Sequence, residues 1–347
     1  MSEKRLKVAV FGAGSIGCYV GGQLLGAGLD VRFVGRERFQ TAIRENGLHL
    51  THYARDPISL GSDIAFDLDA SQIGDADIIL LAVKSQDTKA AGRELSKALK
   101  PGAVVVSFQN GIGNADALRA EMQGYCVLGG MVPFNVTGIG PGAFHCGTEG
   151  DLVIEAMPAG TPQMQMLATL KAAFEQTGQG CVLSDDIKAV QWGKLLVNLN
   201  NALNTLAGVP LKECLRVRDY RLTLVGMIEE ALGILHKAGI KPANFDKNSI
   251  EKTIKVLRMP NWLYGLIMNS IVKIDANARS SMLDDLEAGR TPEIDYLQGE
   301  VVRLAATVGE TAPISHAVIE LVNTAFAAGK SPKMSGREIR AAALEDV

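Results

Sequence analysis

The chain has no marked excess of one charge and no long apolar run. Its 347 residues include 35 basic and 38 acidic side chains, giving a net charge of −3, without a long block of either sign. Such a surface is not favoured electrostatically for nucleic acid or membranes. The apolar runs are too short to span a bilayer, and the first residues lack the pattern of a signal peptide. We therefore expect a cytoplasmic protein that acts on a small molecule.

Cysteine and histidine are also scarce. The cysteines are scattered, odd in number and form no CxxC pair, which suits a reducing compartment without structural disulfides; they are Cys18, Cys126, Cys146, Cys181 and Cys214. The histidines are equally dispersed, and each is better explained as structural or solvated than as a catalytic acid; they are His49, His52, His145, His236 and His316. No metal site is expected.

The length and the 47% apolar fraction predict two globular domains, because a single hydrophobic core stops growing at about 250–300 residues. The first half reads as strands alternating with helices. We expect it to be a Rossmann-type domain over residues 1–186, with strand-like runs at 125–132 and 152–154 that include antiparallel pairing. No fixed-period repeat or low-complexity run interrupts either half.

A glycine-rich turn follows the first expected strand. The apolar run 6–11 leads into GAGSIG, which opens an apolar-periodic helix. In a dinucleotide-binding turn, Gly12 permits the tight bend, Gly14 lets the backbone approach a pyrophosphate, and Gly17 lets the helix pack closely on the strand. The helix N-terminus then faces the phosphates. A purely structural glycine turn is the alternative. The expected cofactor-binding residues are Gly12, Ala13, Gly14, Ser15, Ile16 and Gly17.

The end of the second expected strand favours NADP over NAD. An NAD enzyme usually places an acidic residue there to hold the ribose 2′-OH, whereas this chain has GRER after residues 30–34. A guanidinium at this position can pair with a 2′-phosphate, and Arg36 lies closer to the strand than Arg38. The alternative is that both arginines are ordinary surface charges, an explanation that suits Arg38 better.

Two further strands end in polar residues. Lys84 follows the run 78–83, and Asn110 follows the run 104–108. Open parallel sheets bind ligands at the carboxyl ends of their strands, so the joint placement favours a cofactor role for both residues. A solvated lysine and a simple Asn-Gly turn are the alternatives.

The second half, residues 187–347, changes to a 3.6-residue period with almost no strand-like alternation. It is expected to be an all-helical domain that closes the cofactor cleft. The expected helices are 187–207, 219–239, about 247–276, 280–288, 294–309 and 313–328, followed from Lys330 by a loose amphipathic tail.

The helical stretch WGKLLVNLNNALNTLAG, residues 192–208, carries one lysine and four asparagines among leucines. Asn198, Asn201 and Thr205 fall within about 40° of Lys194 around the helix axis, opposite a leucine face. Asparagine is a mediocre helix former, so propensity does not account for the pattern. Uncharged amides around one ammonium favour an enclosed polar site. A solvated face is the alternative.

The segment ARSSMLDDLEAGRTPEIDYLQG, residues 278–299, resembles a segment of the ketopantoate reductase (2-dehydropantoate 2-reductase) family. WGKLLVN is similar to that family's catalytic helix, and GAGSIG, Lys84 and Asn110-Gly111 occur in the family's order. The resemblance covers nearly the whole chain. It implies a Rossmann domain joined to a helical domain like that of 6-phosphogluconate dehydrogenase. It also implies NADPH-dependent reduction of a 2-oxo acid. Both a monomer and a homodimer are compatible with the sequence.

The resemblance also implies roles for single residues. Lys194 aligns with the family's catalytic lysine and Glu293 with its active-site glutamate, which also contacts the cofactor. Asn198 and Ser281 align with substrate contacts, and Asn110 and Lys84 with residues that hold the cofactor. Partial burial would lower the pKa of the lysine toward roughly 8, where it can both stabilise an alkoxide and donate a proton.

Two departures from the family pattern concern the substrate. Ala202 stands where the family usually has a second asparagine, and Leu211-Lys212 stand where it has another. Asn201 points nearer to Lys194 and is expected to substitute for the missing amide. Reduction of a different 2-oxo acid is therefore kept as an alternative. A nucleotide sensor without turnover is disfavoured, because phosphate binding requires neither Lys194 nor Glu293.

Overall fold

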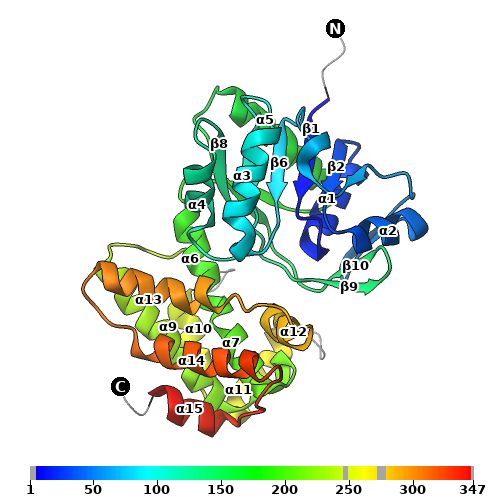
Figure 1. The fold of residues 1–347 in the computed structure, drawn as a ribbon. Helices are drawn as coiled ribbons and strands as arrows, with labels where there is room; N and C mark the ends of the chain where they lie inside the picture. The colour runs from blue at the N-terminus through cyan, green and yellow to red at the C-terminus, as the bar shows by residue number, and fades with distance from the viewer. Residues whose placement is uncertain (1–4, 245–248, 272–278, 345–347) are drawn as a thin grey trace. The chain divides into compact units, whose positions relative to one another are not determined.

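The structure, a computed structural model, describes residues 5–244, 249–271 and 279–344. Its internal contacts divide the chain into two compact units, Met1–Ile187 and Lys188–Val347. The first unit is an α/β domain with a mostly parallel sheet, and the second contains only helices among its described residues (Figure 1). The expected fold class is confirmed.

The first unit contains twelve strands in its described part. They are β1 (Lys7–Phe11), β2 (Asp30–Val34), β3 (Leu48–His52), β4 (Arg55–Leu60), β5 (Phe66–Asp67), β6 (Ile78–Leu81), β7 (Val104–Ser107), β8 (Cys126–Met131), β9 (Val136–Gly140), β10 (Ala143–Cys146), β11 (Leu152–Glu155) and β12 (Cys181–Ser184). Its helices are α1 (Ser15–Gly26), α2 (Glu37–Asn46), η1 (Ala70–Gln72), η2 (Ser85–Asp87), α3 (Thr88–Ala98), α4 (Asn114–Glu121) and α5 (Pro162–Gln176).

The second unit follows with α6, which begins at the unit boundary. Its helices are α6 (Ile187–Asn198), α7 (Asn200–Ala207), α8 (Leu211–Arg216), α9 (Arg218–Lys237), α10 (Ile250–Leu257), α11 (Asn261–Ile271), α12 (Ser281–Glu287), η3 (Ile294–Tyr296), α13 (Gln298–Thr307), α14 (Pro313–Ala327) and α15 (Gly336–Leu344). No helix among the described residues is long and apolar enough to cross a membrane.

The large sheet has eight strands in the order β12-β11-β8-β7-β6-β1-β2-β5. Its neighbours run parallel except for β8 and β11. The expected antiparallel pairing is therefore confirmed. The parallel strands are almost continuously apolar because helices cover both faces of the sheet.

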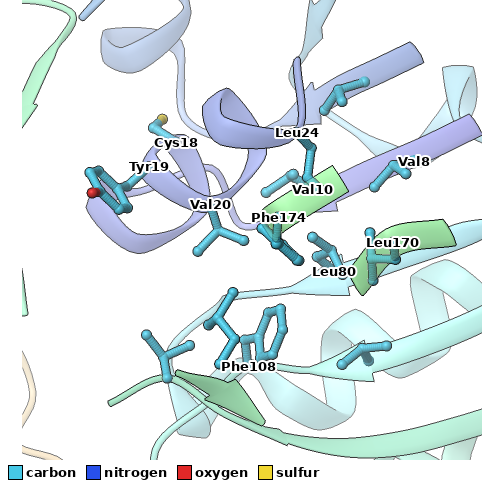
Figure 2. Close-up of a cluster of buried hydrophobic side chains, with 14 of the residues drawn as sticks. Val8, Val10, Cys18, Tyr19, Val20, Leu24, Leu80, Phe108, Leu170 and Phe174 are labelled. Carbon is cyan, nitrogen blue, oxygen red and sulfur yellow. The ribbon is translucent and has the colours of Figure 1, made fainter. Parts of the chain in front are cut away.

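Alternate residues of β1 build two separate cores. Val8 and Val10 belong to the cluster that includes side chains from α1 and α5, such as Leu24 and Phe174 (Figure 2). Ala9 and Phe11 belong to the cluster on the other face, under α3 and α4. Fully burying one side chain the size of Phe174 contributes about 1.5–3 kcal/mol, so both layers hold the sheet rigidly beneath its loops.

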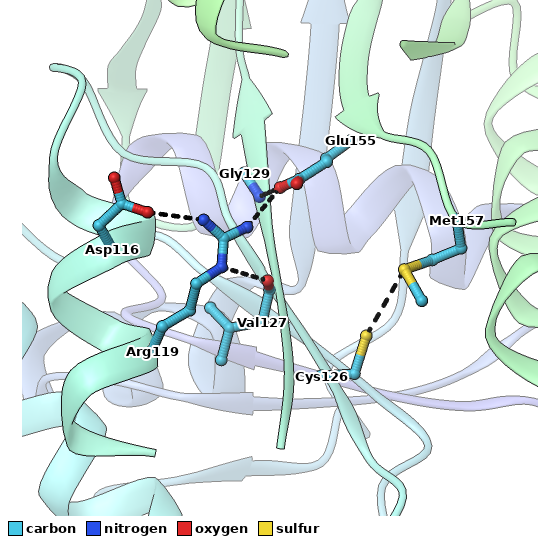
Figure 3. A network of polar contacts seen from close by, with 7 residues as sticks. All are labelled: Asp116, Arg119, Cys126, Val127, Gly129, Glu155 and Met157. Atoms are coloured by element: carbon cyan, nitrogen blue, oxygen red, sulfur yellow. Dashed lines mark hydrogen bonds and ion pairs between the residues drawn. The ribbon is translucent and has the colours of Figure 1, made fainter. Parts of the chain in front are cut away.

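Arg119 braces the antiparallel part of the sheet (Figure 3). Its guanidinium donates to Glu155 Oε2 at 2.6 Å and to the carbonyl oxygen of Val127 at 3.1 Å, and it also pairs with Asp116 on its own helix. The same Glu155 oxygen accepts the backbone N–H of Gly129 at 2.7 Å. The carboxylate thus links α4, β8 and β11 where backbone pairing between the two strands is short.

A second, four-stranded sheet with the order β4-β3-β10-β9 was missed by the sequence reasoning. The alternation of residues in Leu48–His52 could have indicated a strand of this sheet. Leu48, Leu50 and His52 are buried, and the two residues between them are half-buried. His145 lies on β10, where its Nδ1 is 2.8 Å from Thr51 Oγ1. This contact supports a structural role for that histidine.

The helical unit departs from the expected segments in three places. The helix expected over 187–207 is interrupted at Leu199, and the one expected over 294–309 is split into η3 and α13. The segment expected over about 247–276 consists of α10 and α11, separated near Pro260, whose ring cannot continue a helix; residues 247, 248 and 272–276 lie outside the described residues. The short α8 was not expected.

The C-terminal segment is not loose, contrary to expectation. It forms α15, whose Ile339 is fully buried, and Arg340 pairs with Asp219 at 2.9 Å. Just before it, the hydroxyl of Tyr220 donates to the carbonyl oxygen of Met334 at 2.7 Å. The apolar stripe of this helix is therefore part of the core of the second unit.

We predict that Ile339→Ala lowers the free energy of unfolding by about 2–5 kcal/mol, because it leaves a cavity in this core. The exposed Arg337 on the same helix provides the matched control, and Arg337→Ala should change stability by less than about 0.5 kcal/mol. Urea unfolding followed by circular dichroism measures both. Equal stability of the two variants would show that the segment is not packed on the core, as expected of a loose tail.

Candidate functional site

The glycine-rich turn has the geometry that a close approach requires. Gly12 has φ +95°, and a Cβ there would lie 2.6 Å from the backbone nitrogen of Val83. Gly17 is equally constrained, because its Cβ would lie 2.6 Å from the carbonyl oxygen of Gly12. Gly14, at the start of α1, differs: a Cβ there would meet no heavy atom within 4 Å. The turn is thus tightly packed at Gly12 and Gly17 and open at Gly14.

The residues that follow β2 lie beside this turn. The backbone N–H groups of Gly12 and Ala13 both donate to the carbonyl oxygen of Val34 at 2.9 Å, and Gly35 lies against Ala13. Arg36 comes next in the chain, exposed at the start of α2. Arg38 instead stacks on Phe39, with its guanidinium carbon 4.7 Å from the ring centroid, as a surface residue would.

A buried polar network joins the loops after β6 and β7. Gln109 Nε2 donates to Thr88 Oγ1 at 2.7 Å and to the carbonyl oxygen of Val83 at 3.2 Å. Asn114 Nδ2 donates to Ser85 Oγ at 3.1 Å and to the carbonyl oxygen of Asn110 at 2.5 Å. Because satisfied buried networks rigidify the backbone, this one fixes the loops that carry Lys84 and Asn110. Sequence reasoning missed it.

These four loops form one edge of the α/β unit, at the carboxyl ends of β1, β2, β6 and β7. The order of these strands, β7-β6-β1-β2, brings together Gly12–Gly17, Arg36, Lys84 and Asn110 as the sequence predicts. The open space at Gly14 and the N–H groups at the start of α1 fit the pyrophosphate of a dinucleotide.

Lys194 lies on α6, in a tightly packed part of the second unit. The residue before it, Gly193, is approached so closely that a Cβ would lie 2.2 Å from the carbonyl oxygen of Ala243. The residue as a whole is half-buried. Desolvation of the ammonium group lowers the pKa of Lys194 from 10.5 to about 8, and the nearby charge of Glu293 partly offsets this shift. A lysine in this range is a competent acid near neutral pH.

Glu293 comes from a distant part of the chain. It precedes η3 and is buried, with 6% of its surface exposed. Its charge raises the pKa of Lys194, while the larger effect of desolvation lowers it. The structure therefore brings the expected pair together, from segments about a hundred positions apart, within the helical unit.

The asparagine-rich stripe divides into two kinds of residue. Asn198 and Asn201 are half-buried, and the opposite leucine face is buried as expected. Thr205, by contrast, is fully buried, and its hydroxyl donates to the carbonyl oxygen of Asn201 at 2.9 Å. Asn204 is also fully buried. The accessible part of the stripe is thus shorter than the helical wheel indicates, because Thr205 is buried and its hydroxyl bonds within its own helix.

The two serines of the SSM segment have different environments. Ser280 is buried and caps α12, where its Oγ accepts the N–H of Leu283 at 3.2 Å. Ser281 is half-buried, and its hydroxyl has no partner among the described residues. Of the two serines, Ser280 is engaged in capping, whereas the role of Ser281 in ligand binding stays a prediction.

An α/β dinucleotide-type domain followed by a helical domain with a buried lysine–glutamate pair defines a class of two-domain oxidoreductases. The model of the family described as ketopantoate reductase PanE/ApbA matches residues 8–159, and that of its C-terminal domain matches residues 186–325. The chain belongs to the ketopantoate reductase PanE/ApbA family and is an oxidoreductase of that family.

Individual relatives align with this chain along nearly their whole length. The 2-dehydropantoate 2-reductases of Pyrococcus horikoshii and Halobacterium salinarum are each 27% identical to this chain, covering 94% and 92% of it and 100% and 99% of the relatives. The crystal structure of a ketopantoate reductase of the family from Ralstonia eutropha is 29% identical, with a TM-score of 0.78, and covers 93% of this chain and 99% of its own.

A structure of D-mandelate dehydrogenase with NADH and anilino(oxo)acetate shares the fold, with a TM-score of 0.77 at 19% identity over 93% of this chain and 99% of its own. This likeness concerns the fold alone.

We predict that Gly14→Ala weakens dinucleotide binding at least about tenfold without changing the melting temperature of the free protein, because the new methyl group meets only open space. Gly12→Ala is the comparison and should lower the melting temperature, since its Cβ would clash with Val83. Titration of NADPH fluorescence and differential scanning fluorimetry measure the two effects. Unchanged binding by Gly14→Ala would place the dinucleotide elsewhere.

Proposed function

We propose that this protein uses NADPH to reduce ketopantoate (2-dehydropantoate) to pantoate, a step of pantothenate biosynthesis, in the cytoplasm. The observation that carries the proposal is the buried pair of Lys194 and Glu293, with the lysine pKa lowered to about 8, in a chain whose curated relatives include 2-dehydropantoate 2-reductases. Residues 1–186 would form the NADP-binding domain and residues 187–347 the substrate domain. Both a monomer and a homodimer are compatible with this proposal.

The cofactor would be held by the edge formed by Gly12–Gly17, Arg36, Lys84 and Asn110. Gly14 leaves room for the pyrophosphate, and the exposed guanidinium of Arg36 can pair with a 2′-phosphate. Lys84 adds positive charge near the phosphates. Asn110, whose backbone oxygen is fixed by Asn114, would hold the cofactor near the nicotinamide and contact the substrate. Bound NADPH supplies the hydride.

Lys194 would serve the carbonyl oxygen of the substrate twice. Its ammonium stabilises the negative charge that develops on that oxygen and then donates the proton that completes the alcohol. Desolvation makes the ammonium more acidic than a free lysine, while Glu293 prevents it from losing its proton too early. Glu293 would orient Lys194 and contact the substrate hydroxyl and the nicotinamide ribose, without acting as the acid.

The substrate would be held by Ser281, Asn198 and Asn201. Ser281, whose hydroxyl has no partner within the described part of the chain, would donate to the 2-oxo acid carboxylate. The amides of Asn198 and Asn201 are half-buried and can bond hydroxyl and carboxylate oxygens. Asn201 would take the place of the amide that the family usually has where Ala202 stands.

A different 2-oxo acid is the second candidate. Ala202 is buried and offers no hydrogen bond, and Leu211-Lys212 begin α8 where the family has an asparagine. A site lacking these donors would tolerate a less hydroxylated side chain. The structural likeness to D-mandelate dehydrogenase is compatible with such a change of substrate on the same fold.

A panel of 2-oxo acids assayed by loss of NADPH absorbance tests the proposal. Ketopantoate should give the highest kcat/KM of the panel, with branched and aromatic 2-oxo acids at least about tenfold lower, the scale set by one or two pocket contacts. A higher kcat/KM for another acid would replace ketopantoate and keep the reaction type. No turnover of any 2-oxo acid would remove the reductase proposal.

We predict that activity depends on the protonation of Lys194. Since the acid form is required and its pKa is about 8, kcat should fall as the pH rises through about 8. Lys194→Ala should lower kcat by at least about 10² and abolish this alkaline limb. The pH profiles of both proteins measure the effect. If a folded Lys194→Ala variant kept a kcat within a few-fold of the parent's, the polar stripe would be only a solvent-exposed face of the helix.

We also predict a preference for NADPH over NADH. Arg36→Ala should narrow the difference in kcat/KM between the two cofactors, chiefly by raising KM for NADPH, because only NADPH carries the 2′-phosphate. Arg38→Ala is the matched control, since Arg38 stacks on Phe39, and should leave the preference within about twofold. Equal use of both cofactors by the parent protein would contradict the assignment.

A further inference from the structure

A buried glutamine contacts the interruption between α6 and α7. Gln298, the first residue of α13, is fully buried, and its Nε2 donates to the carbonyl oxygen of Leu199 at 3.1 Å. Helix interruptions commonly coincide with a side chain inserted at the backbone. Gln298 follows Glu293 by one short turn, η3, so this hydrogen bond ties the segment of Glu293 to the end of the helix that carries Lys194.

Stability alone would not favour a glutamine at position 298. Its Oε1 is buried without a hydrogen-bond partner among the described residues, and leaving a buried acceptor unsatisfied destabilises the folded protein. An apolar side chain of similar length would avoid that cost. Local rules are most often broken where a geometric requirement of function outweighs them.

A second buried amide makes a parallel connection from α7. Asn204 is fully buried, and its Oδ1 accepts the backbone N–H of Ser280 at 2.9 Å. Its Nδ2 donates to the carbonyl oxygen of Val209 at 2.5 Å, just beyond the end of α7. The same side chain thus connects α7 to the start of α12, where Ser281 follows Ser280 directly.

We propose that Gln298 and Asn204 are positioning residues that hold the interrupted helix to two different parts of the substrate site. Gln298 sets the distance between Lys194 and Glu293, and Asn204 sets the place of Ser281 relative to Asn198 and Asn201. This division rests on the proposed reductase function. It explains why the stretch contains more amides than a substrate wall needs.

The two amides have separable kinetic signatures. Loss of the Gln298 contact loosens the groups that act on the reacting carbonyl, and a displacement of about 1 Å at a reacting group can cost about 10²-fold in rate. Loss of the Asn204 contact displaces the serine that holds the carboxylate in ground and transition states alike, which raises KM with little change in kcat.

The experiment compares Gln298→Met and Asn204→Leu, which keep approximate size and remove the amide, by steady-state kinetics at saturating NADPH. Gln298→Met should lower kcat at least about tenfold with KM for the 2-oxo acid within about threefold. Asn204→Leu should raise that KM at least about tenfold with kcat within about threefold, as should Ser281→Ala.

Thr223→Val is the matched control. Thr223 is fully buried on α9, and its hydroxyl donates to the carbonyl oxygen of Asp219 in its own helix, 3.1 Å away. Removing this hydroxyl should leave kcat and KM unchanged, because the bond lies within one helix. If a variant does not fold, Gln298→Asn and Asn204→Ser retain a shorter polar group and carry the same expectations.

Two results would overturn the inference: kinetics like those of Thr223→Val in either variant, or equal changes in kcat and KM in both. Failure of the underlying function is distinguishable, because the parent protein would then turn over no 2-oxo acid, or Lys194→Ala measured in parallel would turn over at the parent's rate. A reductase that depends on Lys194 but is indifferent to Gln298 and Asn204 would keep the proposed function and remove the positioning roles.

Discussion

Burial of one ammonium beside one carboxylate is the constraint on which the helical unit depends. In the unfolded chain Lys194 keeps its proton up to its ordinary pKa of 10.5, whereas in the folded protein it loses the proton near 8. Between these values the unfolded state binds more protons, so stability rises with pH across that window and is lower below it. At neutral pH the folded protein carries this cost, which the buried leucine face of α6 and α7 must offset.

The two units meet opposite demands. In the α/β unit, two apolar layers pack on the faces of the large sheet, and hydrogen bonds of Gln109 and Asn114 fix the loops after β6 and β7. In the helical unit, polar groups lie along a helix that is itself interrupted, so single amides such as Gln298 must supply the rigidity that a sheet edge provides by its topology.

Much of this arrangement could be predicted from the sequence, where local pattern decides the outcome. GAGSIG, the strand-terminal Lys84 and Asn110, and the helical period after residue 187 each depend on nearby residues alone. The pairing of Lys194 with Glu293 came from family resemblance, because no periodicity relates positions so far apart. The break at Leu199, the burial of Asn204 and the docking of α15 could not be predicted, since each depends on a partner distant in sequence. A helical wheel gives direction around the axis but not burial, and it placed on the polar stripe Thr205, which is fully buried.

Direct titration of Lys194 tests the central claim. Nuclear magnetic resonance of protein carrying labelled lysine, with Lys194→Ala to assign the signal, reports the protonation of that one ammonium across the pH range. We predict a midpoint near 8, and a lower midpoint in Glu293→Gln, because the carboxylate raises the lysine pKa. A midpoint near 10.5, or one that does not respond to Glu293→Gln, would contradict a buried, functionally coupled pair.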